Sequence, residues 1–167
     1  LHANSANQAL DRIINFFPEE RRAQLLMDLS LNLKALISQR LLPRQEGRGR
    51  IAAVEIMLNS PLISDLIFKG EVGEIKEVMK RSREQGMQTF DQALFDLFES
   101  YAVSEEDALR NADSLNDLRL QIKLKSQRVK RDLNEGIGDI TFGGDDYKKE
   151  VNALSPSNRR AGDKRPS

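Results

Sequence analysis

Cysteine and tryptophan are absent from this sequence of 167 residues, and it contains a single histidine, His2. Without cysteine there is no disulfide, no zinc site built on thiolates and no thiol nucleophile. One histidine at the second position leaves no basis for a histidine metal cluster or a hydrolase triad. The sequence also lacks a Gly-x-x-x-x-Gly-Lys-Ser/Thr phosphate loop and an apolar strand that ends in paired acids. These absences argue against an autonomous active site.

An excess of charge of one sign and long apolar runs are lacking as well. Lysine plus arginine and aspartate plus glutamate both number 26, so the formal net charge is zero. Whole-chain charge therefore favours neither nucleic acid nor an acidic membrane as a partner. No apolar run approaches the roughly 20 residues that a membrane helix needs. The sequence opens on Leu1-His2-Ala3-Asn4 without an initiator methionine or a signal peptide, so we expect the C-terminal part of a longer protein.

Two strand-like runs flank a short polar turn. The second, Arg50–Leu58, is a nearly unbroken apolar run with β-branched residues, which is typical of a strand buried on both faces. The first, Leu36–Leu42, is ended by Pro43, and residues 45–49 between the two runs read Gln-Glu-Gly-Arg-Gly. This pattern predicts an antiparallel β-hairpin.

One carboxylate, Glu55, falls inside the second apolar run. A buried carboxylate requires a partner. We expect an ion pair with Arg40 or Arg50 across the hairpin. The alternative is a polar contact near a nucleotide or a subunit interface.

Four arginines cluster around the hairpin, namely Arg40, Arg44, Arg48 and Arg50. A helix followed by a basic hairpin is similar to the wing of a DNA-binding domain. Arginines without interleaved aromatic residues are more typical of a solvated loop or of a contact to acidic groups. The alternative function is a helical interaction module that binds protein or nucleic acid, with Arg44, Arg48 and Arg50 on phosphates and a steep salt dependence.

Capping signals and apolar spacing predict short helices on both sides of the hairpin. The expected starts are Asn4 or Ser5, Pro18, Ser60 with Pro61, Thr89 with Gln92, Ser104 and Ser114. Gly70 and Gly86 are the expected stops. These signals assign residues 1–125 to the folded part. Residues 126–167 lose the periodicity and predict a disordered tail, because so polar a segment buries too little apolar surface to offset its ordering entropy.

Four stretches carry a resemblance to a known family. They are Leu1–Ala6 (Leu-His-Ala-Asn-Ser-Ala), Ser38–Leu41 (Ser-Gln-Arg-Leu), Arg50–Met57 (Arg-Ile-Ala-Ala-Val-Glu-Ile-Met) and Gly86–Asp91 (Gly-Met-Gln-Thr-Phe-Asp). The first resembles the end of the His box of type II/IV secretion ATPases, and the others resemble stretches of type IV pilus retraction ATPases. The sequence is thus similar to the PilT/PilU family from Leu1 to about Leu124.

Residues 62–67 favour the PilU type over the PilT type within this family. They read Leu-Ile-Ser-Asp-Leu-Ile, where PilT-type proteins carry Ala-Ile-Arg-Asn-Leu-Ile, a segment tied to retraction. Ser64 and Asp65 replace the arginine and the asparagine. Because of this departure, the resemblance does not directly imply that this protein has the retraction role of PilT.

The resemblance implies an α/β fold, the C-terminal part of a RecA-like P-loop ATPase domain with short helices around the hairpin. It implies a hexamer in the cytoplasm, peripheral to the inner membrane at the pilus base, whose ATP hydrolysis drives pilus retraction. ATP and Mg²⁺ would be bound mainly by residues upstream of Leu1. His2 would be the His-box histidine near the γ-phosphate. The chain alone would then be catalytically incomplete.

The resemblance also implies partners. They are further copies of the protein, a PilT-type ATPase and the inner-membrane platform protein of the pilus, without nucleic acid. The helix Pro61–Lys69 would mediate contacts between subunits or with a partner ATPase. Its candidate interaction residues are Pro61, Leu62, Ile63, Ser64, Asp65, Leu66 and Ile67.

Overall fold

The computed structural model describes residues 5–138 of the chain. His2 and the segment 139–167, most of the predicted tail, therefore lie outside the described residues. The chain divides into two units, and the first ends at Val129. Apart from residues 130–138, the fold and the sites described below belong to this first unit.

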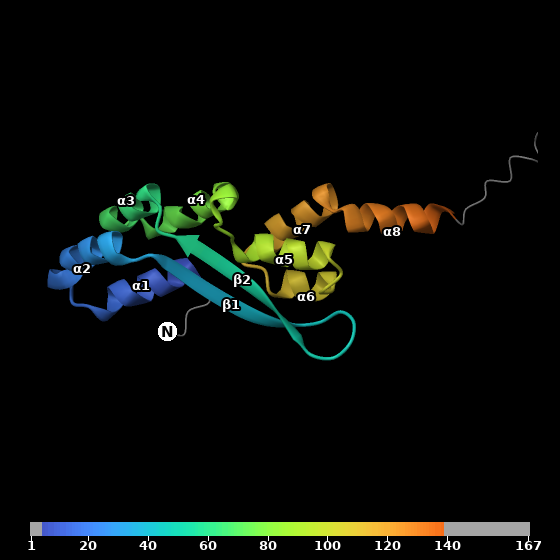
Figure 1. Cartoon of the computed structure of the whole chain (residues 1–167), viewed down its shortest axis with the longest axis horizontal. Helices are drawn as coiled ribbons and strands as arrows, with labels where there is room; N and C mark the ends of the chain where they lie inside the picture. Colours follow the sequence, from blue (N-terminus) through green and yellow to red (C-terminus); the bar gives the residue numbers. More distant parts are fainter. Residues whose placement is uncertain (1–4, 139–167) are drawn as a thin grey trace, which may run out of the picture. The chain divides into compact units, whose positions relative to one another are not determined.

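The predicted antiparallel hairpin is confirmed, and it consists of β1 (Ala35–Pro43) and β2 (Arg50–Leu58) (Figure 1). On β2, Ala53, Glu55 and Met57 are buried, and the side chains between them are only half-buried. The prediction of a strand buried on both faces is therefore wrong. Helices cover one face of the hairpin, so alternate residues of β2 point away from the core.

The outer face of the hairpin is apolar and open. Ile37 and Leu41 on β1 are 70% and 55% exposed. The free edge of β2 is bridged at one point, where Ile56 and Gln88 exchange backbone hydrogen bonds of 2.8 and 2.9 Å. This bridge fixes the segment that leads into the next helix, which starts at Phe90.

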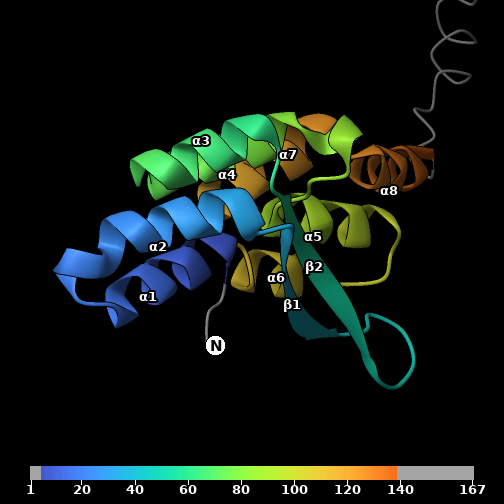
Figure 2. The ribbon, with the colours of Figure 1, turned by 60° about the vertical axis from the view of Figure 1, so that its left-hand side comes forward.

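One end of the hairpin packs with four helices (Figures 1 and 2). They are α1 (Ala6–Phe16), α2 (Glu19–Asn32), α3 (Pro61–Lys69) and α4 (Ile75–Arg81). The predicted caps are confirmed: Ser5 and Ser60 accept backbone N–H groups in the first turns of α1 and α3, and Gly70 ends α3 with φ 75°. Their apolar faces meet in a first core that includes Leu10, Met57, Ile63, Ile67, Ile75 and Met79.

The middle of the hairpin packs with three further helices. They are α5 (Phe90–Glu99), α6 (Glu105–Arg110) and α7 (Leu115–Lys125). The predicted capping box of Thr89 and Gln92 opens α5, and Ser104 and Ser114 cap the other two. Leu42 and Ala53 of the hairpin join Phe90, Leu94, Leu118 and Ile122 in this second core. Since Met57 belongs to the first core, the hairpin connects both cores.

Short connections complete the described chain. Two 3₁₀ turns, Val72–Glu74 and Arg83–Gln85, flank α4. A last helix, α8 (Gln127–Gly138), follows α7, at the start of the segment that the sequence predicts to be a disordered tail. None of the helices in the described part of the chain combines the length and apolar character that crossing a bilayer requires.

The start of α8 is held by a buried arginine, Arg128, which explains why order continues past residue 126. Its guanidinium donates to the carbonyl oxygens of Phe98 (2.8 Å) and Val103 (3.1 Å) and to the side chain of Gln45 (2.8 Å). It also lies 4.3 Å from the ring centroids of Phe98 and Tyr101. Arg128 therefore ties the start of α8 to the α5–α6 connection and to the hairpin turn.

Candidate interaction surface

The predicted interaction helix α3 has a buried face and an exposed face. Buried in the first core are Ile63, Leu66 and Ile67. Exposed are Pro61, Leu62 and Asp65. The structure thus divides the seven predicted residues, and only the exposed side of α3 is accessible to another protein.

Ser64, the seventh, joins α3 to α2. Its hydroxyl donates to the carbonyl oxygen of Ser30 (2.7 Å). The side-chain amide of Asn59 donates to the same carbonyl (2.9 Å) and to that of Leu33 (2.8 Å). These bonds satisfy carbonyl groups at the end of α2 that have no partner within the helix. They hold the two helices side by side, as both views show (Figures 1 and 2).

A shallow groove of about 310 Å³ lies between these two helices, and we call it the α2–α3 groove. It is lined by Met27, Ser30, Leu31, Pro61, Ser64, Asp65 and Phe68. The larger apolar side chains in its walls are open to solvent, because Met27 is 45%, Leu31 63% and Phe68 56% exposed. Exposed apolar side chains that gather in one patch make this groove a candidate for a contact with another protein.

Three apolar residues of the groove escaped the sequence analysis, namely Met27, Leu31 and Phe68. A signal for Met27 and Leu31 exists, since they are four residues apart and therefore neighbours on α2, outside its core stripe. Phe68 follows Asp65 by three positions and so shares its exposed face. Only the packing of α2 against α3 brings the three together.

Glu55 does not form the predicted ion pair. Its Oε1 accepts the N–H of Ala6 at 2.7 Å, at the start of α1, and the N–H of Phe90 also donates to its carboxyl group. The register places Ser38 opposite Glu55. The first N–H groups of a helix have no partner within it, so these donors take the place of an arginine.

The arginines of the hairpin do not form one cluster. Arg40 turns toward the helices, where it pairs with Asp113 at 2.6 Å and lies 4.0 Å from the ring centroid of Phe90. The other three, Arg44, Arg48 and Arg50, are exposed at the turn. Arg40 is therefore structural, and the predicted basic surface is reduced to three side chains.

Two acids, the buried Asp91 and the partly buried side chain of Asp113, form a network where the two cores meet. Asp113 bridges Arg40 and Lys76, and its side chain is 15% exposed. Asp91 is buried and accepts the N–H groups of Asp113 (2.8 Å) and Ser114 (3.1 Å) ahead of α7. The network therefore joins β1, α4, α5 and the connection before α7.

The pKa values of these acids shift in different directions. Burial raises the pKa of Glu55 and of Asp91, and the backbone donors only partly offset the loss of water. Burial also acts to raise the pKa of Asp113, but hydrogen bonds from Lys76 and Arg40 outweigh it and lower that pKa. Glu55 and Asp91 thus bind a proton more tightly in the folded chain than in the unfolded chain.

A Glu55→Gln variant is expected to change how stability depends on pH. Because the pKa of Glu55 is raised in the folded chain, protonation favours folding, and this stabilisation is lost as the pH rises above the ordinary value of 4.5. The free energy of unfolding of the parent chain should therefore fall relative to that of Glu55→Gln between pH 4 and pH 7. Urea titrations at intervals of one pH unit measure this difference. Parallel pH profiles of the two chains would contradict the raised pKa of Glu55. Asp91 and Asp113 are present in both chains, so their contributions cancel in the comparison.

The described residues do not by themselves fit Mg²⁺-ATP. Between residues 5 and 138 the sequence has no phosphate loop, and the structure has no group of three or more acidic or histidine side chains placed to hold a metal ion. His2, the predicted γ-phosphate contact, lies outside this range.

Comparison with known proteins decides the family. No family model matches the chain. It is 62% identical over 127 residues to the type IV pilus ATPase PilU of Pseudomonas aeruginosa, a match that covers 76% of this chain and 33% of PilU. The matched residues belong to the PilT/PilU family. PilT of the same organism is 37% identical over 112 residues, 67% of this chain and 32% of PilT.

The fold of the PilT/PilU family agrees with this assignment. The crystal structure of the pilus retraction motor PilT with bound ADP matches with a TM-score of 0.63 and 31% identity, over 71% of this chain and 33% of that chain. The predicted fold class is confirmed. It is α/β, the C-terminal part of an ATPase domain in which short helices surround a β-hairpin. The chain spans about a third of the length of the PilT and PilU proteins it matches.

Proposed function

We propose that this chain is part of an ATPase that couples ATP hydrolysis to type IV pilus retraction and twitching motility. The observation that carries the proposal is the 62% identity with PilU over 127 residues. The likeness to an ADP-bound PilT motor supports nucleotide binding by the whole protein. A hexamer in the cytoplasm, at the pilus base beneath the inner membrane, belongs to the same proposal.

The described residues contribute to this ATPase by positioning. ATP with Mg²⁺, bound mainly by other parts of the protein, supplies the phosphoryl-transfer chemistry. Ser5 caps α1, and Glu55 accepts the N–H of Ala6, so the first turn of that helix is fixed. His2 precedes Ser5 by three residues in the sequence. We propose that this fixed helix start places His2 near the γ-phosphate, as a donor to developing charge.

The α2–α3 groove is the proposed surface for another protein. Its partner would be a PilT-type ATPase, a neighbouring subunit or the inner-membrane platform protein. Support comes from its exposed apolar walls and from its position on the predicted interaction helix. A partner side chain in the groove would remove Leu31 and Phe68 from water, at about 25 cal/mol per Å² of apolar area.

Replacing Leu31 and Phe68 by serine in the full-length protein tests this surface. Both side chains are more than half exposed, so the fold should be retained. Losing two apolar contacts should weaken partner binding about 10- to 100-fold and reduce pilus retraction. The rate of ATP hydrolysis should change little. Retraction is measured by twitching assays, and hydrolysis by phosphate release.

Leu115→Ser is the matched control, because Leu115 is 42% exposed on α7, away from the groove. It should leave retraction unchanged. Normal retraction in the Leu31, Phe68 variant at normal protein level would overturn the assignment of the groove. A full-length protein that does not hydrolyse ATP would instead overturn the proposed activity, so the two failures are distinguishable.

A further inference from the structure

The outward face of α7 carries two uncovered leucines. Leu120 is 57% exposed and Leu124 is 64% exposed. They are four residues apart, so they lie next to each other on the helix surface. The same helix buries Leu118 and Ile122 in the second core. Leu120 and Leu124 therefore form a second apolar strip on the opposite side of α7.

Cations flank this strip of leucines. The exposed bases of α7 are Arg119, Lys123 and Lys125, and none of them forms an ion pair with another residue in the described part of the chain. The one acid of α7, Asp117, lies 4.0 Å from Lys80. The basic leucine face, as we call the two leucines and the three bases, therefore combines apolar area with unpaired positive charge.

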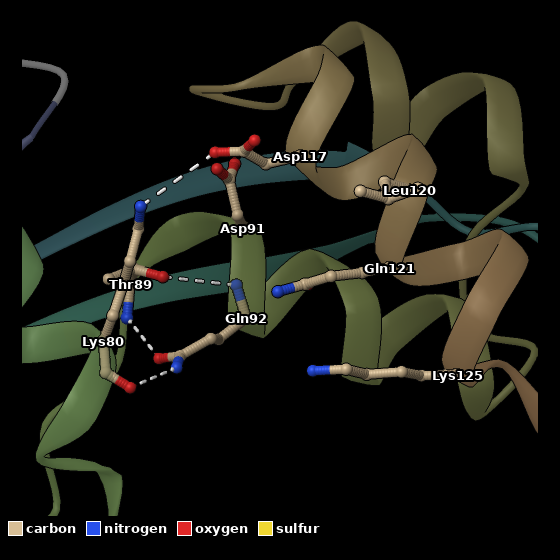
Figure 3. A pocket seen from close by; sticks show the side chains of 8 residues that line it. All are labelled: Lys80, Thr89, Asp91, Gln92, Asp117, Leu120, Gln121 and Lys125. Atoms are coloured by element: carbon tan, nitrogen blue, oxygen red, sulfur yellow. Dashed lines mark hydrogen bonds and ion pairs between the residues drawn. The ribbon is translucent and has the colours of Figure 1, made fainter.

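A hollow of about 350 Å³ adjoins the basic leucine face between α5 and α7 (Figure 3). Leu120 and Lys125 are among the residues that line it. Figure 3 shows Gln121 and Lys125 pointing from α7 toward the α5 side, where Gln92 lies. The face is thus hollowed on one side, where a side chain of a partner can enter beside Leu120.

A groove of the opposite charge lies at the turn from α1 to α2 and holds about 360 Å³. Phe17 in its wall is 41% exposed, and Phe16, the preceding residue, is 77% exposed. The lining contains two acids and one base, and Glu19 adds a third exposed acid at the start of α2. None of the three acids forms an ion pair within the described part of the chain. The acidic aromatic groove, as we call it, is lined by Phe17, Glu20, Arg21, Gln24, Leu25 and Asp28.

The basic leucine face and the acidic aromatic groove complement each other. Leucines on one side match phenylalanines on the other, and unpaired bases match unpaired acids, which favours association in one orientation. The two surfaces cannot meet within one chain, because α1 and α2 pack in the first core and α7 packs in the second, and Figure 1 shows them apart. We propose that the basic leucine face of one copy binds the acidic aromatic groove of a second copy.

The α2–α3 groove is a poorer match for the basic leucine face. Its acid Asp65 is already paired with Lys69 at 2.7 Å, so that groove offers no unpaired negative charge. The acidic aromatic groove offers both the charge and the aromatic side chains. The second copy therefore binds at the α1–α2 turn.

A contact between two different surfaces leaves one of each free on every pair of copies, and it is satisfied throughout only in a closed ring. The proposal therefore rests on the hexamer of the proposed function and names one contact within it. A stable interface buries about 800 Å² on each partner, and two leucines with three bases supply only part of that area. A single contact should thus be weak, and ring closure strengthens it because the last contact forms within one assembly.

Site-specific crosslinking tests the contact, because the chain has no cysteine of its own. Asn116→Cys places a thiol beside Leu120 on α7, and Gln24→Cys places one in the acidic aromatic groove; both positions are exposed. In a mixture of the two variants, a short bis-maleimide should join unlike copies at least about fivefold more than like copies. Leu62→Cys on α3, mixed with Asn116→Cys, is the matched control and should give only background.

Charge reversal on each side identifies the surfaces. Lys123→Glu in the Asn116→Cys copy should lower the crosslink yield about 3- to 10-fold, and so should Glu20→Lys in the Gln24→Cys copy. The two reversals together should restore most of the parent yield, which damage to the fold would not do. Equal joining of like and unlike copies, or no restoration in the double reversal, would overturn the contact.

Sedimentation of the full-length protein checks the hexamer separately. A full-length protein that stays monomeric would overturn the hexamer of the proposed function. Hexamers whose Asn116→Cys and Gln24→Cys positions are not joined would overturn only the proposed contact. Since ions screen exposed charges, the crosslink yield should also fall as salt rises from about 0.1 M to 1 M and the Debye length drops from about 10 Å to 3 Å.

Discussion

An Ile67→Ala variant is expected to lower the free energy of unfolding by about 2–5 kcal/mol, and Leu62→Ala by less than about 0.5 kcal/mol. Both side chains belong to the same short helix, α3. Ile67 is fully buried in the first core, and Leu62 is 54% exposed. Removing Ile67 leaves a cavity that the packed core closes only in part, while removing Leu62 leaves none.

Urea unfolding of both variants measures this difference, and near-equal losses would show that the two faces of α3 are assigned wrongly. The result matters for the proposed interaction surface. Leu66 and Ile67 are core residues, so a polar replacement there reduces function through unfolding. Only exposed residues of the α2–α3 groove, such as Leu31 and Phe68, can separate partner binding from stability.

An Arg128→Ala variant is expected to lower the free energy of unfolding by about 2–4 kcal/mol. The guanidinium is buried, and its loss leaves the carbonyls of Phe98 and Val103 without this donor. A hydrogen bond to a charged group contributes about 1.5–3 kcal/mol, and each ring contact contributes less. The loss also removes the bond to Gln45 that ties the hairpin turn to this site.

Two controls accompany Arg128→Ala. Arg131→Ala removes an exposed arginine three positions later and should change stability by less than about 0.5 kcal/mol. Arg128→Lys keeps the charge but has no planar fork for three acceptors and two rings, so it should recover only part of the loss. Equal stability of Arg128→Ala and Arg131→Ala in urea titrations would contradict the structural role of Arg128.

Local signals were sufficient for much of the fold. Ser5, Ser60, Thr89, Ser104 and Ser114 each cap the helix predicted from them. A cap is a contact within four residues, so a sequence pattern contains both partners. The hairpin was predictable for the same reason, because its turn and its two runs are adjacent.

Contacts between distant residues account for the errors. Arg128 lies in a polar stretch that predicts disorder, yet its partners are Gln45, Phe98 and Val103, up to 83 positions away. Glu55 accepts an N–H from Ala6, 49 positions earlier. No pattern local to Arg128 or Glu55 indicates these donors and acceptors.

The sequence by itself determined the helix caps, the hairpin and, through its motifs, the membership of the PilT/PilU family. These features depend on neighbouring residues or on residue identity alone. Only the tertiary structure decided which face of α3 is open, that Met27 and Leu31 of α2 line a groove with Phe68, and that Arg128 extends the order past α7. The physical reason is burial, because exposure is settled by what packs against a side chain, and for these residues the packing partners come from other elements of the fold.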